Sequence, residues 1–178
     1  MRVITAPEGY EPSRNDFKVF LAGGISKCPD WQAEVIKQLG EHEYKNLVLF
    51  NPRRDNFPIG DETQAAAQIA WEYEMLEQCD IFSMYFCASE SDQPICMYEL
   101  GRNIVRMQMR FPIDWEKRIV IDIEDGYRRK KDVIYQTLMA TGSYAFIDSN
   151  SNPQDHASNI LFQCKCLDFD VWRTCDDE

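Results

Sequence analysis

The sequence predicts an α/β protein in which helices cover both faces of a mostly parallel, five-stranded sheet, forming a three-layer sandwich. Short apolar runs alternate with segments of helical periodicity along the chain, as in strands connected by helices. Glycine or proline follows the first two apolar runs, where each strand must turn. A chain of 178 residues with 44% hydrophobic content can bury one substantial core, so we expect a single domain over residues 1–178.

The first expected strand is the apolar run Phe17–Ala22, which stops at a pair of glycines. A helix should follow, with Pro29 near its start and Trp31, Val35, Ile36 and Leu39 on one face, and end near Gly40. The second strand, residues 46–50, is closed by Asn51-Pro52, and a polar loop then covers residues 53–61. Loops of this kind commonly carry binding groups.

The second expected helix covers residues 62–78 and leaves Glu72 near the edge of its apolar stripe. The residues of that stripe are Ala66, Ile69, Ala70, Tyr73 and Leu76. The remaining strands are expected at residues 80–86, 117–123 and 144–147, and the remaining helices at residues 95–109, 130–139 and 154–163. From about residue 167 the chain is an acidic tail without a clear period, which we expect to pack on the domain or on a neighbouring subunit.

Ligands of open α/β sheets bind beyond the carboxyl ends of the strands, at the point where the strand order reverses. In the flavodoxin-like (Rossmann-like) order 2-1-3-4-5, that point lies between the first and third strands. The turn Gly23-Gly24 would then lie beside residues 87–92 and form one crevice with them. Glu99 would enter this crevice from the helix after the third strand.

Acidic side chains at the crevice are the candidate catalytic residues. Glu99 is expected near the start of a helix, between apolar neighbours, and Glu72 and Asp92 are the other candidates, with Glu74 competing with Glu72. Cleaving a bond between a sugar and a base needs one carboxylate at the anomeric carbon and an acid that protonates the departing base. A carboxylate near a helix N-terminus is also favoured by the helix dipole alone, so its position has a structural explanation as well.

Composition excludes several classes of partner. A formal net charge of -11 argues against sequence-independent binding of a nucleic acid polymer, because such binding needs Lys and Arg to neutralise the phosphates. The charge does not exclude binding of a single nucleoside or nucleotide. Residues 1–17 are polar and contain proline, so we expect no signal peptide, and no apolar run approaches the roughly 20 residues of a membrane span. We therefore expect a soluble, cytoplasmic protein that does not bind membranes.

The seven cysteines form no CxxC pair, and the chain has only two histidines. We therefore expect no metal site and no metal cofactor, and we expect most cysteines to be reduced and buried.

Four segments stand in a characteristic order. They are Phe20-Leu21-Ala22-Gly23-Gly24-Ile25, then Asn51-Pro52-Arg53-Arg54, then Gln68-x-x-Trp71-Glu72 running to Cys79-Asp80, and finally Glu99-Leu100-Gly101-Arg102. In this combination the sequence resembles the nucleoside 2-deoxyribosyltransferase family, particularly a branch common in bacterial and phage genomes. The resemblance covers roughly residues 18–133.

The resemblance implies roles for the acidic residues. In that family the Glu of the Glu-Leu-Gly segment is the nucleophile and forms a covalent deoxyribosyl intermediate, which here is Glu99. An acidic residue eight positions before Asp80, here Glu72, handles the proton of the base. The family's sugar-contacting Asp stands six positions before the nucleophile, whereas the nearest Asp here, Asp92, stands seven positions before it, so Gln93 is a second candidate.

The resemblance also implies that the turn Gly23-Gly24-Ile25 faces the sugar and base, and that no cofactor is required. The substrates would be nucleosides or nucleotides together with free nucleobases. Family members complete their sites from a neighbouring chain, so the resemblance implies a homo-oligomer. Trp71 could stack on a base or fill the core, and the arginine pair at residues 53–54 could bind a phosphate or pair with nearby acids.

The function predicted on this basis is that of a nucleoside 2-deoxyribosyltransferase, which moves 2-deoxyribose between nucleobases through a covalent intermediate on Glu99. An alternative is a hydrolase of nucleosides or nucleoside monophosphates on the same fold, with Ser89 or Ser91 contacting a 5′-phosphate. Another is a protein that binds a nucleotide without cleaving it, because fold does not fix function.

Overall fold

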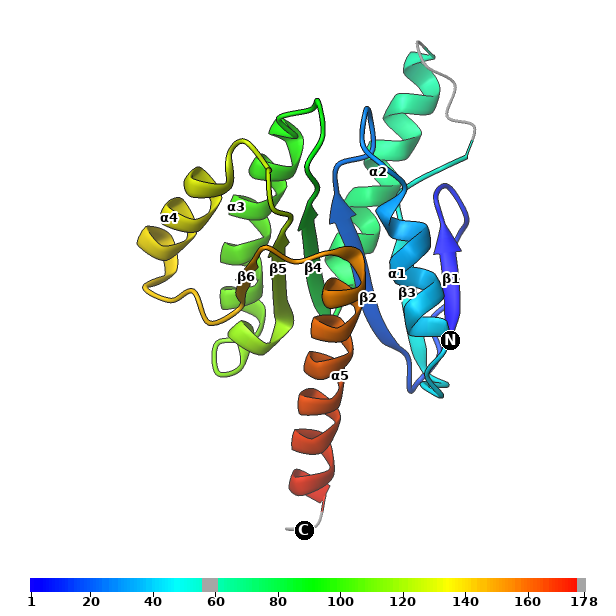
Figure 1. Cartoon of the computed structure of the whole chain (residues 1–178). Coiled ribbons are helices and arrows are strands. Elements are labelled where there is room, and N and C mark those ends of the chain that lie inside the picture. The colour runs from blue at the N-terminus through cyan, green and yellow to red at the C-terminus, as the bar shows by residue number, and fades with distance from the viewer. Residues whose placement is uncertain (56–60, 176–178) are drawn as a thin grey trace.

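The computed structural model describes residues 1–55 and 61–175, with side chains as far as residue 167. Within these residues six parallel strands form one sheet in the order β1-β3-β2-β4-β5-β6 (Figure 1). The strands are β1 (Arg2–Thr5), β2 (Phe17–Gly23), β3 (Leu47–Asn51), β4 (Ile81–Phe86), β5 (Ile119–Ile123) and β6 (Ile147–Ser149). The helices are α1 (Trp31–Gly40), α2 (Glu62–Gln78), α3 (Pro94–Arg110), α4 (Lys130–Thr141) and α5 (Pro153–Cys175), with the short 3-10 helix η1 (Trp115–Arg118).

The predicted strand order is confirmed. The five expected strands correspond to β2 through β6, and their order in the sheet is the expected 2-1-3-4-5. The prediction missed β1, which pairs with β3 at the edge of the sheet. Its four residues are too few to stand out as an apolar run in the polar start of the chain.

Several element bounds differ from the prediction. The last strand is Ile147–Ser149, not residues 144–147, and β5 begins at Ile119 because residues 115–118 form η1. The final helix does not end at residue 163 but continues to Cys175, so most of the tail expected to lack a period is helical. The rest of that tail and residues 56–60 of the polar loop lie outside the described residues.

Helices α1 and α5 cover one face of the sheet, and α2, α3 and α4 cover the other (Figure 1). Side chains of β2 point alternately to the two faces, as in any strand. Val19 and Leu21 pack in the core beneath α1 and α5, whereas Phe20 and Ala22 pack in the core beneath α2 and α3. Both faces are therefore buried, which explains why the inner strands are continuous apolar runs.

Helix α2 does not bury the apolar stripe expected from its sequence. Ala66, Ile69, Ala70 and Tyr73 are exposed, with Ile69 at 65% and Tyr73 at 54%. The buried residues of α2 are Gln68, Trp71, Met75 and Leu76. The large indole of Trp71 packs beside the rings of Phe20 and Phe50 and so turns a different side of the helix to the sheet.

A buried polar network joins α5 to the sheet. Ser83 of β4 lies 2.7 Å from His156 Nε2 of α5, and His156 Nδ1 hydrogen-bonds to Asp122 of β5. All three side chains are buried. Asp122 also accepts hydrogen bonds from Ser151 at 3.2 Å and from Asn159 at 2.9 Å, so the buried carboxylate is well satisfied.

None of the described helices is both long enough and apolar enough to cross a membrane.

Candidate functional site

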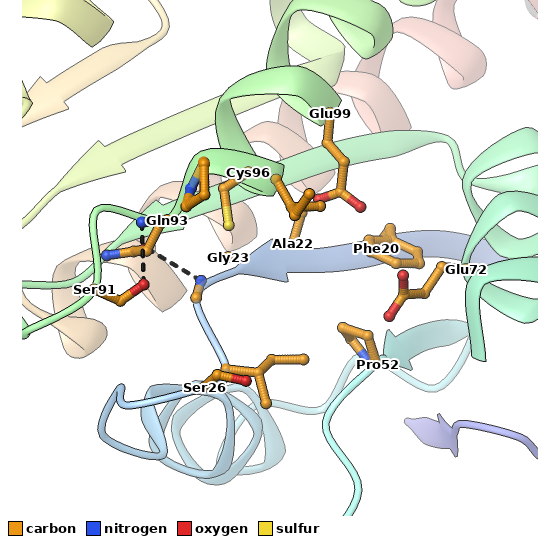
Figure 2. A pocket seen from close by; sticks show the side chains of 14 residues that line it. Phe20, Ala22, Gly23, Ser26, Pro52, Glu72, Ser91, Gln93, Cys96 and Glu99 are labelled. Atoms are coloured by element: carbon orange, nitrogen blue, oxygen red, sulfur yellow. Dashed lines mark hydrogen bonds between the residues drawn. The ribbon is translucent and has the colours of Figure 1, made fainter. Parts of the chain in front are cut away.

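A cavity of about 240 Å³ opens where β2, β3 and β4 end (Figure 2). Phe20 and Ala22 belong to the strand beneath it, and Glu72 of α2 and Glu99 of α3 lie in its walls. The other residues that line it are Gly23, Gly24, Ile25, Ser26, Pro52, Ser91, Gln93, Pro94, Ile95 and Cys96. The crevice is therefore at the expected edge of the sheet, between its expected walls.

A second, smaller cavity of about 170 Å³ adjoins the first. The two share Ile25, Ser26, Pro52 and Glu72, and the second is also lined by Arg54 and Gln68. Glu72 thus borders both cavities, with Glu99 on one side of it and the Gln68 side chain on the other.

Gln93 joins the two loops that form one end of the cavity. Its backbone is left-handed, with φ of 50°, and its side chain is buried. The Oε1 atom accepts a hydrogen bond from the Gly24 N–H at 3.1 Å, and the Nε2 atom donates to the Cys87 carbonyl at 2.7 Å. Since both ends of this amide are engaged within the protein, Gln93 holds the cavity wall in shape.

The expected turn Gly23-Gly24 lines the cavity, but its glycines are required by contacts within the protein. A Cβ on Gly23 would lie 2.4 Å from the Tyr85 backbone oxygen and 2.5 Å from the Trp31 ring. A Cβ on Gly24 would lie 2.6 Å from Gln93 Oε1. The glycines therefore allow this loop to pack against β4, α1 and the segment before α3.

The carboxyls of Glu72 and Glu99 face the same space beside Phe20 (Figure 2). Burial raises the pKa of Glu99 from 4.5 to about 7, with the Glu72 charge adding to the rise and Arg102 opposing it. Burial also raises the pKa of Glu72, while a hydrogen bond from Gln68 opposes the rise. Two carboxyls in one poorly solvated cavity resist ionising together, so the pair retains one proton at a higher pH than an exposed carboxyl would.

Asp92 and Trp71 do not line the cavity. The Asp92 carboxylate is 59% exposed and forms a salt bridge of 3.1 Å with Arg128, and its backbone carbonyl accepts a hydrogen bond from Tyr127. This contact with the segment before α4 turns Asp92 away from the cavity. Trp71 is buried, and its indole N–H donates to the Glu8 carbonyl at 2.7 Å. The structure thus places Trp71 in the core, one of its two expected positions.

Arg53 binds within the protein. It donates to the backbone carbonyls of Pro29, Ile25 and Cys28 at 2.7, 3.1 and 2.8 Å. It therefore ties the loop after β2 to the end of β3. Arg54 donates to Gln64 and reaches the second cavity.

Glu74, the competitor of Glu72, is exposed on α2 and accepts a hydrogen bond from Gln78 at 3.4 Å. It lies outside both cavities. Of the two serines expected near a phosphate, Ser91 lines the first cavity, whereas Ser89 Oγ lies 3.3 Å from Cys28 Sγ.

Sequence reasoning did not single out Pro52, Cys96 or Gln68 as parts of the site. Gln68 and Pro52 belong to the motif segments, but nothing in their residue types marks them as facing a cavity.

No group of three His, Cys, Asp or Glu side chains among the described residues is arranged to hold a metal ion.

Comparison with known proteins identifies the segment that forms the site. A family model described as nucleoside 2-deoxyribosyltransferase like matches residues 16–111, which is more than half of the chain. The matched segment runs from β2 to the end of α3 and contains all residues that line the two cavities. A search of curated proteins found no match. The extent of the family match shows that the chain belongs to the nucleoside 2-deoxyribosyltransferase-like family.

Proposed function

We propose that this protein is a nucleoside 2-deoxyribosyltransferase that retains the configuration at the anomeric carbon. The observation that carries the proposal is the pair Glu72 and Glu99, two partly buried carboxyls from neighbouring helices that face one cavity and whose pKa values are both raised. Raised carboxyl pKa values in a cleft are typical of catalytic acids and nucleophiles. Family membership makes a nucleoside the expected substrate.

In the first step a carboxylate oxygen of Glu99 attacks the anomeric carbon while the bond to the base nitrogen breaks. The electron pair of that bond goes to the base, and the Glu72 carboxyl supplies the proton that makes the base neutral. In the second step another base attacks the anomeric carbon and displaces Glu99. Glu72 takes up the proton that the incoming base loses, so the enzyme returns to its starting state.

The substrate contacts in this proposal come from the residues that line the cavity. Gly23, Gly24 and Ile25 contact the substrate through the backbone, and the Ser91 hydroxyl takes the sugar contact first assigned to Asp92. Gln93, whose amide is engaged by Gly24 and Cys87, holds the loop that carries Ser91 in place. Because Asp92 is held at the surface by Arg128, we assign it no direct contact in this state.

We also propose that the protein functions as a homo-oligomer. Ile69 and Tyr73 of α2 and Ile95 and Tyr98 of α3 are large, exposed hydrophobic side chains, and Ile95 also lines the cavity. A second subunit that covered this face would shield the cavity from water. Light scattering coupled to gel filtration should give a mass of at least twice the 20.9 kDa chain.

The decisive experiment incubates the protein with a panel of 2′-deoxynucleosides, with and without a free acceptor base, and separates the products by chromatography. A new nucleoside that forms only with the acceptor supports transfer. Substrates that bind but remain intact would refute catalysis and favour a binding protein.

A hydrolase is the second candidate, and one observation favours it. Ser91 lines the cavity together with Ile95 and Cys96 of the first turn of α3, a helix whose N-cap residue Gln93 makes no side-chain cap hydrogen bond. A hydroxyl beside a helix N-terminus can bind a phosphate. Release of free sugar phosphate and base from deoxynucleoside monophosphates, whether or not an acceptor is present, would identify this activity.

A further inference from the structure

We propose that Gln68 is the positioning residue for Glu72: it fixes one carboxyl oxygen and leaves the other to exchange the proton with the base. This inference rests on the proposed function, because it concerns the proton that the departing base requires. It gives a role to a buried side chain that none of the steps above uses.

The contacts of Gln68 fix the orientation of its amide. Nε2 donates to the Pro52 carbonyl at 2.7 Å and to Glu72 Oε1 at 2.8 Å. A flipped amide would direct Oε1 at the Pro52 carbonyl, which can only accept a hydrogen bond, so the NH2 group must face these two oxygens.

The orientation leaves Gln68 Oε1 buried without a hydrogen-bond partner among the described residues. Burying an acceptor without a partner is unfavourable. The structure therefore keeps the two hydrogen bonds that Nε2 donates, although Oε1 is left without one. This preference indicates that the position of the NH2 group matters more than a hydrogen bond to every polar atom of the amide.

The consequence for Glu72 is that its two carboxyl oxygens differ. Oε1 accepts from Gln68, whereas Oε2 has no hydrogen-bond partner among the described residues. A proton on Oε1 would compete with the amide hydrogen, so the exchangeable proton belongs on Oε2. The amide is in turn fixed by the backbone at the end of β3, which makes the carboxyl part of the rigid sheet edge.

The hydrogen bond also affects how readily Glu72 releases its proton. It stabilises the ionised form and so lowers a pKa that burial raises. The charged groups that face Glu72 are Glu99 from α3 and Arg54 from the segment after β3, while β2 presents only Phe20 and Ala22. Without Gln68, Glu72 would hold its proton to a higher pH and would be a weaker acid toward the base.

The variant Gln68→Met tests this role, because it keeps the length of the side chain and removes its NH2 group. We expect kcat for an ordinary purine 2′-deoxynucleoside to fall at least tenfold, and the alkaline limb of the pH profile to move to higher pH. The matched control is Gln78→Met, which removes a Gln–Glu hydrogen bond of the same spacing on the exposed part of α2. The control should leave both quantities unchanged.

A second substrate separates proton delivery from binding. An N7-methylated purine 2′-deoxynucleoside already carries the positive charge on its base, so the base leaves as a neutral molecule without being protonated. Gln68→Met should cleave this substrate at close to the wild-type rate. Equal losses on both substrates, or an alkaline limb that does not move, would overturn the proposal.

The wild type distinguishes failure of this inference from failure of the proposed function. If the wild type cleaves no deoxynucleoside, the proposed function fails, and the role of Gln68 fails with it. If the wild type is active and Gln68→Met shows no selective loss, only the role of Gln68 fails. If Gln68→Met does not fold, Gln68→Glu is the second variant, because it keeps the side-chain shape and places a carboxyl beside Glu72. We expect it to move the alkaline limb of the pH profile of kcat to still higher pH. An alkaline limb that does not move would again refute the proposal.

Discussion

Replacing Glu99 by Gln should abolish activity and make the folded protein more stable at alkaline pH. Burial beside Glu72 raises the Glu99 pKa from 4.5 to about 7, so the folded state binds the proton more tightly than the unfolded chain does. Stability from this group is fully present below pH 4.5 and is lost as the pH rises through about 7. Glutamine has nearly the same shape and never ionises, so the variant avoids this loss.

The magnitude follows from the pKa. Each pKa unit corresponds to about 1.4 kcal/mol, so ionising Glu99 in the folded protein costs about 3 kcal/mol. Partial exposure of the side chain reduces this to about 2–3 kcal/mol. For a chain of this size, that difference raises the melting temperature of Glu99→Gln above that of the wild type by roughly 4–12 °C at pH 8.

Thermal unfolding followed by circular dichroism at pH 4.5 and pH 8 would measure the difference. Glu74→Gln is the control, because Glu74 is exposed on α2 outside the cavity, so its replacement should leave the melting temperature close to that of the wild type. A Glu99→Gln variant with the same stability as the wild type at pH 8, or with an equal gain at both pH values, would refute the electrostatic reasoning. Retained transfer activity would refute the role of Glu99 as nucleophile.

Three further predictions concern packing, the buried network and pH. Gly23→Ala should lower the free energy of unfolding, measured in urea, by about 1–3 kcal/mol, because the new Cβ would lie 2.4 Å from a backbone oxygen. Gly101 lies within a helix and has open space around it, so Gly101→Ala should raise the free energy of unfolding by about 0.5–1 kcal/mol. His156→Leu should cost about 3–5 kcal/mol in the same assay, because it leaves Asp122 Oδ2 and the Ser83 hydroxyl buried without the imidazole that bonds to both; a loss below about 1 kcal/mol would contradict this reasoning. In steady-state assays, kcat/KM for base transfer should rise as the pH approaches about 7, where Glu99 becomes the ionised nucleophile, and should fall again at the pH where Glu72 loses its proton; a profile without the alkaline fall would argue against a required acid.

The order of the strands could be predicted from the sequence because each inner strand is buried on both faces and therefore stands out as an apolar run. The edge strand Arg2–Thr5 has only one neighbour and no fully buried residue, so it leaves no such run. The extension of α5 was missed for a related reason. Its final turns follow the acidic residues after Leu167, where the sequence has no clear apolar period.

The site was predictable where it depends on topology and not where it depends on the direction of single side chains. Glu72 and Glu99 meet because α2 and α3 pack on the same face of the sheet beside the switch point. Asp92 turns away because Arg128, 36 positions later in the chain, pairs with it, and no local pattern reveals such a contact. Neighbouring residues on a helix point about 100° apart, so Trp71 enters the core while Glu72 reaches the cavity.

The buried trio of Ser83, His156 and Asp122 has the composition and connectivity of a serine hydrolase triad, yet no substrate can reach it. A hydroxyl linked to an imidazole and a carboxylate becomes a nucleophile only if it can approach an electrophile. Here the serine points from the middle of a central strand into a covered face, so the same hydrogen bonds that activate a nucleophile elsewhere serve to attach the terminal helix. Residue identity and hydrogen-bond geometry alone would thus assign a hydrolytic centre to the wrong face of this sheet, and solvent access is what distinguishes a reactive serine from an anchoring one.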